Sequence, residues 1–136
     1  MKVVVDTNVL VSGLLNPFGP PGELVRMTAD GSLELCFDAR ILAEYREVLL
    51  RPHFGFEPEL VEALLAQIES GGHLSSGRPL HRSLPHADDE AFLEIASAEG
   101  VSVLVTGNLR HYPPDRRQGV RVVDPREFIE SLRRGR

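Results

Sequence analysis

The stretch KVVVDTNVL, residues 2–10, decides the fold. Its three consecutive valines show no alternation of apolar and polar residues, a pattern typical of a strand that is buried on both faces of a parallel sheet. We therefore predict a central parallel strand over residues 2–5. The strand ends at Asp6, and the apolar residues that follow predict a helix from Asn8 to Leu15.

Beyond this stretch, predicted strands and helices alternate along the chain. Further strands are expected over residues 33–37, 101–105 and 120–123, with a weak strand within residues 73–87. Helices are expected over residues 23–29, 39–50, 57–69, 88–99 and 125–132. The segment 16–22 is rich in Pro and Gly and is predicted to be a loop. This alternation predicts an α/β fold, in which helices cover both faces of a parallel sheet.

Two aspartates are predicted to begin helices. Asp38 precedes the helix expected over residues 39–50, where its carboxylate suits an N-cap. Asp124 is followed by Pro125 and Glu127, a spacing that matches a capping box with Pro at the first helical position.

Length and composition restrict the class of protein. The 136 residues suit one domain, expected to span residues 1–136, and 42% hydrophobic with 26% charged residues exclude a disordered chain. A single cysteine, Cys36, excludes an intrachain disulfide and a cysteine-rich zinc site and suits a reducing cytoplasm. No apolar run reaches the roughly 18 residues of a membrane span, and the segment before Asp6 is too short for a secretory signal. We therefore expect a cytoplasmic protein with no membrane partner.

The net charge of −5 is unevenly distributed. Residues 1–107 hold 16 Asp and Glu against 7 Lys and Arg, whereas residues 108–136 hold 8 Arg against 4 Asp and Glu. An acidic body with a basic end suits a metal site beside an edge that contacts phosphate, and it equally suits an ordinary solvated surface. The clusters at 116–117 and 133–136 are candidates for holding RNA or an acidic partner segment, or are solvated helix ends.

Polar residues gather where the predicted strands end, which is where parallel sheets bind their ligands. Asp6 follows the first strand, and Thr106 and Asn108 follow a later one. Asp88 and Asp89 begin a predicted helix at the same edge and fall within its apolar arc at about 100° per residue. Acids on a buried face need a reason, and both N-capping and metal binding supply one.

Glu44 is a further candidate. Its predicted helix has an apolar face, and Glu44 lies about 100° from the centre of that face, whereas Glu47 lies about 160° away. Glu44 is therefore either a flanking residue that leans toward the crevice or a surface glutamate. Together with Asp6, Asn108 and one of the two neighbouring aspartates it forms an oxygen-only set, which suits Mg²⁺ or Mn²⁺ rather than zinc. A divalent cation would also relieve the repulsion between these carboxylates.

These motifs resemble those of a PIN domain, the nuclease domain of VapC-type toxins in toxin–antitoxin pairs. The resemblance rests on DTNVL at 6–10, Glu44 in a middle helix, DDEAFL at 88–93 and LVTGN at 104–108. The four motifs occur in the family's order over nearly the whole chain. The chain is particularly similar to the branch of toxin components in which an aspartate pair precedes Phe.

The resemblance implies a single PIN-like domain, a three-layer sandwich with a parallel five-stranded sheet flanked by helices. It also implies a Mg²⁺- or Mn²⁺-dependent endoribonuclease that hydrolyses RNA phosphodiesters with metal-activated water. By this resemblance the metal-binding acids are Asp6, Glu44 and either Asp88 or Asp89, with Asp89 favoured by its spacing to Gly100. The implied catalytic residues are Asp6, Glu44, Asp89 and Asn108, and the implied substrate-positioning residues are Thr7, Asn8 and Thr106. Asn108 stands where the family often has Asp, which leaves the number of metals, one or two, open.

Asn108 in place of an acid also supports an alternative, a non-cleaving PIN-like module that binds RNA or a protein partner. A phosphatase of another parallel-sheet family is a third interpretation. The five histidines include no i, i+4 pair, so a zinc site is not expected. Motifs for dinucleotide binding, a P-loop and a nucleophile elbow do not occur. His111 is either a phosphate contact or an exposed loop residue.

The partners that the resemblance implies are RNA, a cognate antitoxin protein and a second copy of the chain in a homodimer. The sequence offers one apolar stripe for such a dimer on the helix expected over residues 57–69. The same stripe is equally explained as part of the core. Its members are Leu60, Val61, Leu64, Leu65 and Ile68.

Overall fold

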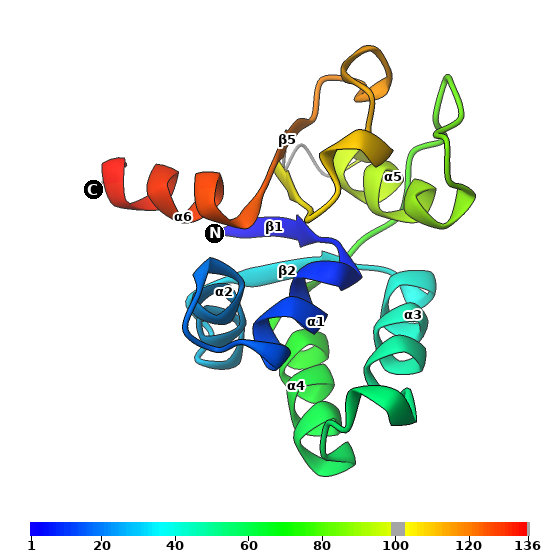
Figure 1. The fold of residues 1–136 in the computed structure, drawn as a ribbon. Coiled ribbons are helices and arrows are strands. Elements are labelled where there is room, and N and C mark those ends of the chain that lie inside the picture. Colours follow the sequence, from blue (N-terminus) through cyan, green and yellow to red (C-terminus); the bar gives the residue numbers. More distant parts are fainter. Residues whose placement is uncertain (99–102, 136) are drawn as a thin grey trace.

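The computed structural model describes residues 1–98 and 103–135 and has a five-stranded sheet in which every pair of neighbouring strands is parallel (Figure 1). The strand order is β3-β2-β1-β4-β5, so the first strand of the chain is central, as predicted. The strands are β1 (Lys2–Val5), β2 (Glu34–Phe37), β3 (His73–Leu74), β4 (Val103–Val105) and β5 (Arg121–Val123).

In the part of the chain that the structure describes, six α-helices complete a three-layer α/β sandwich, as predicted. They are α1 (Thr7–Leu15), α2 (Pro20–Ala29), α3 (Ala39–Leu49), α4 (Pro58–Gly71), α5 (Glu90–Ala98) and α6 (Pro125–Arg134). Figure 1 shows α1, α2 and α4 on one side of β1 and β2, and α5 on the other side. Asp38 and Asp124 cap their helices as predicted, because their side chains accept hydrogen bonds from the backbone of Ile41 and Glu127.

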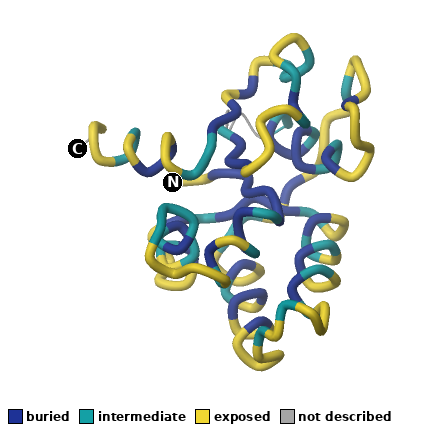
Figure 2. The backbone as a smooth tube through the Cα atoms, viewed as in Figure 1, coloured by how far each residue is buried: buried dark blue, intermediate teal, exposed yellow. Residues whose placement is uncertain are grey.

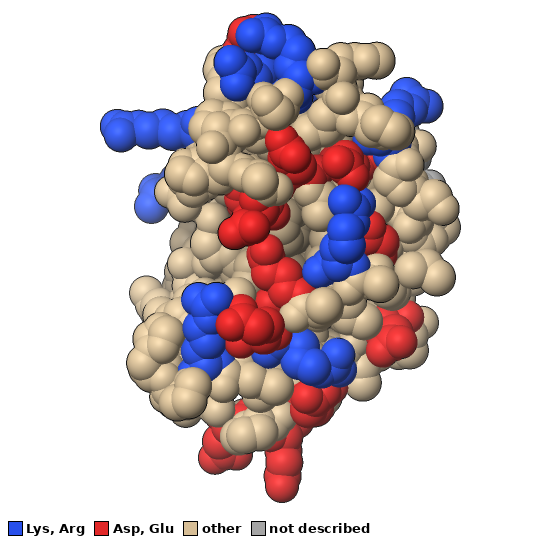
Figure 3. All heavy atoms as spheres, turned by 90° about the vertical axis from the view of Figure 1, so that its right-hand side faces the viewer, with Lys and Arg blue, Asp and Glu red and all other residues tan. Residues whose placement is uncertain are grey.

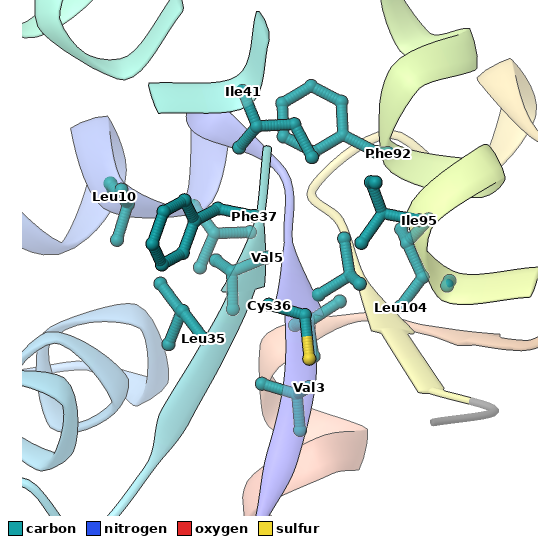
Figure 4. Packing of buried hydrophobic residues seen from close by; sticks show 14 of the residues in the cluster. Val3, Val5, Leu10, Leu35, Cys36, Phe37, Ile41, Phe92, Ile95 and Leu104 are labelled. Atoms are coloured by element: carbon teal, nitrogen blue, oxygen red, sulfur yellow. The ribbon is translucent and has the colours of Figure 1, made fainter. Parts of the chain in front are cut away.

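The valines of β1 form the centre of the core. Val3, Val4 and Val5 are 0% exposed, and they are flanked by β2 on one side and by β4 on the other. Figure 2 shows the buried segments concentrated along the strands, with exposed residues on the outer turns of the helices. In Figure 4, Leu35 and Phe37 of β2 lie on the same side as Leu10, whereas Cys36 lies on the side of Ile95. Both faces of the sheet are therefore covered by apolar side chains.

Two boundaries differ clearly from the prediction, and a third lies partly outside the described residues. The segment 16–22 is only partly a loop, because α2 begins at Pro20, and Pro is favoured at the start of a helix since its missing N–H is not needed there. The helix expected from Asp88 begins as a short 3₁₀ helix, η2 (Ala87–Asp89), and continues as α5. Of the strand expected over residues 101–105, residues 101 and 102 lie outside the described residues, as do Glu99 and Gly100.

The apolar stripe on α4 belongs mostly to the core. Val61, Leu64, Leu65 and Ile68 are buried, and only Leu60, which is 66% exposed, faces outward. The stripe therefore offers little free surface to a second copy of the chain. Within the described residues, no helix has the length and apolar character needed to cross a bilayer.

Candidate active site at the carboxyl ends of the strands

A cleft of about 840 Å³ lies at the carboxyl edge of the sheet and brings together five acids from three separate segments. Asp6 follows β1, Glu44 and Glu47 lie on α3, and Asp88 and Asp89 lie in η2. Figure 3 looks onto this edge and shows a band of Asp and Glu side chains across the face, with Lys and Arg on either side. The parallel topology explains the convergence, because all strands of such a sheet end at one edge.

Asp6 is the most firmly held of these acids. It is only 4% exposed, and its Oδ2 accepts hydrogen bonds from the Thr106 hydroxyl at 2.9 Å and the Tyr112 hydroxyl at 3.0 Å. Its backbone N–H donates to the carbonyl of Val105, which ties it to the neighbouring strand. Burial raises the pKa of Asp6 above its ordinary value, and the two hydroxyl donors offset part of this rise. The carboxylate is therefore oriented before any ligand arrives.

Glu44 projects from α3 toward the same point. The hydroxyl of Thr7, at the start of α1, donates a hydrogen bond to Oε2 of Glu44. Partial burial raises the pKa of Glu44, and the negative charges of Asp6, Asp88 and Asp89 raise it further. The structure thus places Glu44 among the other acids and not on a solvated surface.

The two neighbouring aspartates differ in their surroundings. Asp89 is 8% exposed, and its Oδ2 lies 2.9 Å from Nδ1 of His111, whereas Asp88 is exposed. Nδ1 of His111 is close enough to pair with Oδ2 of Asp89 when the imidazole is protonated, but the contact lacks hydrogen-bond geometry, and this oxygen accepts no hydrogen bond from any described residue. Burial raises the pKa of Asp89, as does the charge of Asp6, and His111 lowers it. Asp89 is therefore the aspartate of the pair that faces Asp6.

Two residues of this site are new relative to the sequence analysis. His86 packs its ring against His111, with ring centroids 4.1 Å apart, and so helps to hold the partner of Asp89. Tyr112 is fully buried, and no local pattern distinguishes it from a core tyrosine. Arg117 donates from Nε to the carbonyl of Tyr112 at 2.8 Å, so this basic residue supports the site from behind. Since the interaction of Tyr112 spans 106 residues of sequence, periodicity alone could not reveal it.

The three predicted positioning residues lie around the acids. The Thr7 hydroxyl donates a hydrogen bond to Glu44, and the Thr106 hydroxyl donates one to Asp6. Asn8 lines the cleft, but its Oδ1 accepts a hydrogen bond from the backbone of Gly107 at 2.9 Å. Asn8 therefore links α1 to the loop after β4.

Asn108 is not brought into the acidic cleft. Its backbone N–H donates to the hydroxyl of Thr106 at 3.0 Å, but the residue is exposed and lines a separate hollow of about 320 Å³. That hollow also contains Arg110 and Asp124. Asn108 thus contributes to the orientation of Thr106 and, through it, of Asp6, while its own amide lies elsewhere.

The donor set suits a hard divalent cation, although the carboxylates are not gathered around one point. Asp6, Glu44 and Asp89 supply oxygen ligands only, and burial together with their like charges raises the pKa of each, so a cation would relieve a real electrostatic cost. Among residues 1–98 and 103–135, no three His, Cys, Asp or Glu side chains are close enough to hold a metal ion. The contacts of Glu44 with Thr7 and of Asp89 with His111 account for the separation.

The basic end of the chain is used mainly for internal contacts. Arg116 donates to the carbonyl of Ser83 at 3.0 Å, and Arg133 pairs with Glu23 at 2.9 Å. Arg134 lies 3.5 Å from the hydroxyl of Ser131. Arg136 lies outside the described residues. Arg116 and Arg133 thus connect separate segments of the fold, whereas Arg110 makes no ion pair with any described residue.

Comparison with known proteins agrees with this architecture. An uncharacterized protein of Methanocaldococcus jannaschii, MJ1680, is 28% identical over an alignment of 144 positions that covers 97% of this chain and 92% of the relative. No solved structure matches the chain at a significant level. The sequence profile of the PIN domain matches residues 2–110, which contain all five acids that line the cleft. The chain therefore belongs to the PIN domain family, whose members are typically nucleases.

Proposed function

We propose that this protein is a Mg²⁺- or Mn²⁺-dependent endoribonuclease that hydrolyses RNA phosphodiesters. The observation that carries the proposal is the convergence of Asp6, Glu44 and Asp89 from three segments in one cleft. These three acids would hold the metal, with Asp88 at the rim. A divalent cation bound there supplies an activated water and neutralises phosphodiester charge.

The remaining residues of the site position these acids. Thr106 and Tyr112 both donate to Oδ2 of Asp6, which leaves its Oδ1 without a side-chain donor among the described residues. The Thr7 hydroxyl donates to Glu44 in a similar way, and His111 lies 2.9 Å from Asp89. Asn8 and Asn108 fix the loop after β4 against α1 and Thr106. Such outer contacts set the orientation of metal ligands and tune their affinity.

The test is RNA cleavage by the purified protein with Mn²⁺, with and without EDTA. We expect cleavage that EDTA abolishes and that Asp6→Asn removes. Folded protein that binds RNA at micromolar concentration but never cuts it would support the alternative of a non-cleaving RNA- or partner-binding module, which the position of Asn108 outside the cleft favours. Faster turnover of a simple phosphate ester than of RNA would indicate a phosphatase.

We further propose that the protein acts in the cytoplasm as the toxin of a toxin–antitoxin pair, as a homodimer that a cognate antitoxin inhibits. The resemblance to VapC-type toxins supports this role. Two measurements test it: growth arrest on expression, relieved by co-expression of a small neighbouring gene, and the mass in solution by light scattering. A monomer at tens of micromolar would rule out the dimer.

A further inference from the structure

We propose that the end of the cleft remote from the acids is a subsite for one unpaired nucleobase, with the ring of Phe54 as its wall. The proposal rests on the proposed nuclease function and defines its substrate class as single-stranded RNA. Phe54 lines the same cleft as Asp6 and Glu44, so one continuous hollow joins an acidic end to an aromatic one.

The cleft runs between two helices. On α1 its lining residues are Thr7, Asn8, Val11 and Ser12, and on α3 they are Ala43, Glu44, Glu47 and Val48. Each set repeats at three- and four-residue intervals, which places it along one face of its helix. Since α3 rises about 1.5 Å per residue, the step from Glu44 to Arg51 carries the cleft on the order of 10 Å from the acids. Figure 1 shows this helix leading away from the sheet toward the segment that holds Phe54.

The Phe54 ring is held in a short rigid segment, η1 (Pro52–Phe54). Its backbone N–H donates to the carbonyl of Arg51, and the segment closes at Gly55, whose φ of 70° suits glycine. The Phe54 centroid lies 4.2 Å from that of His53 and 5.4 Å from that of Phe56, whose ring is nearly parallel to it. A ring fixed in this way needs little ordering when a ligand arrives.

The chemistry of this end differs from that of the acids. Val11, Val48 and Phe54 supply apolar surface, and Arg51 is the cation among the lining residues of α3 and η1. Nε and Nη2 of Arg51 donate to Glu47 at 3.2 and 2.8 Å, while its Nη1 donates no hydrogen bond to a described residue. Apolar and aromatic surface with one available guanidinium N–H suits a base with its phosphate and does not suit a second metal ion.

The subsite requires an unpaired base. In a duplex the faces of the bases are stacked on one another, whereas in a single strand they are free to stack on an aromatic side chain. Stacking does not depend on the base, so the subsite should tolerate all four. It also does not read the 2′-hydroxyl, so discrimination of RNA from DNA must come from elsewhere in the cleft.

A fluorescent variant tests the subsite directly. The chain has no tryptophan, so Phe54→Trp introduces one indole, in place of a ring that already lines the cleft. The matched control is Phe18→Trp, because Phe18 is 93% exposed and lies outside this cleft. We expect a single-stranded octaribonucleotide to quench the Phe54→Trp emission and to leave Phe18→Trp unchanged. The same strand annealed to its complement should not quench either variant.

Cleavage kinetics give a second, independent readout. Phe54→Leu keeps apolar volume but removes the ring, and we expect KM for single-stranded RNA to rise on the order of tenfold with kcat nearly unchanged. Phe18→Leu should behave as the parent. No quenching of Phe54→Trp at oligonucleotide concentrations that saturate binding by anisotropy, or quenching by the duplex, would overturn the subsite. If the parent cleaves RNA but Phe54→Leu and Phe18→Leu have equal KM values, the subsite is overturned and the nuclease proposal stands. If the protein neither binds nor cleaves any RNA, the nuclease proposal is overturned as well.

Discussion

The hydroxyl of Tyr112 donates a 3.0 Å hydrogen bond to Oδ2 of Asp6, across 106 residues of sequence. Both groups are buried, and burial raises the pKa of Tyr112 far above its ordinary value, so its hydroxyl remains a donor at every pH at which the protein is folded. The bond fixes the direction of a carboxylate that we propose as a metal ligand. Tyr112 is therefore a positioning residue, which acts through Asp6.

Replacing Tyr112 with Phe should weaken metal binding about 10- to 100-fold, as is typical of residues that orient a metal ligand. The matched control is Tyr45→Phe. Tyr45 is equally buried and donates its hydroxyl to the carbonyl of Val5 at 2.5 Å, so its loss leaves a buried acceptor unpaired at about 1–3 kcal/mol but leaves Asp6 untouched. Mn²⁺ titrations by calorimetry compare the two. Equal Mn²⁺ affinities would show that the Tyr112 hydroxyl serves stability only.

The sequence predicted those parts of the fold whose signals are local. The valines of β1, the caps at Asp38 and Asp124, and the segment of Asp88 and Asp89 each depend on neighbouring residues, and each lies where it was expected. The start of α2 at Pro20 was missed because Pro marks a loop and a first helical turn equally well. A weak strand was expected within residues 73–87, and β3 lies in this segment, but it has only two residues and its position is set by its pairing with Cys36 and Phe37 of β2.

The candidate site was predicted in part. The end of β1 placed Asp6 at the carboxyl edge of the sheet, whereas the spacing in α3 left Glu44 open between a residue that flanks the crevice and a surface glutamate. Two further contacts of the acids, those of His111 with Asp89 and of Tyr112 with Asp6, come from the 3₁₀ segment η3 (Leu109–His111) and the residue after it, where helical or strand periodicity carries no information. For the same reason the exposed position of Asn108 could not be anticipated from its place in the motif.

Substitutions of Asp88 and of Asp89 should affect RNA cleavage to different extents. Asp89→Asn replaces the buried carboxylate that faces Asp6, and we expect it to lower kcat at least 100-fold. Asp88→Asn changes an exposed residue at the rim, and we expect a loss of less than tenfold. Single-turnover cleavage with saturating Mn²⁺ measures both. The reverse order of the two losses would assign the ligand to Asp88.

Asp6→Asn should remove cleavage and leave the fold intact. An Asn amide oxygen still accepts from Thr106 and Tyr112, so the buried hydroxyls stay satisfied, while the negative charge that repels Glu44 and Asp89 is lost. In EDTA the variant should therefore melt no lower than the parent and up to a few degrees higher. Added Mn²⁺ should raise the Tm of the parent much more than that of the variant. A Tm about ten degrees below that of the parent would instead identify Asp6 as a structural residue.

The difference between the Tm of the parent and that of Asp6→Asn should depend on pH with opposite signs in the absence and in the presence of metal. Burial raises the pKa of Asp6, Glu44 and Asp89 above the values of the unfolded chain, and for Glu44 and Asp89 the charges of neighbouring acids add to this rise. In EDTA the folded chain therefore binds more protons than the unfolded chain at a pH between the unfolded and the folded pKa values. As pH rises from about 4 through the raised values, ionisation of Asp6 removes stability from the parent, and Asp6→Asn escapes this loss.

With Mn²⁺ the reverse applies, because a bound cation requires the ionised carboxylate, and rising pH favours the parent. We therefore expect the parent's Tm minus that of Asp6→Asn to fall in EDTA as the pH rises above about 4, and to rise with pH in Mn²⁺. Thermal melts of both proteins at four pH values measure this difference. Parallel curves in the two conditions would show that Asp6 does not bind the metal.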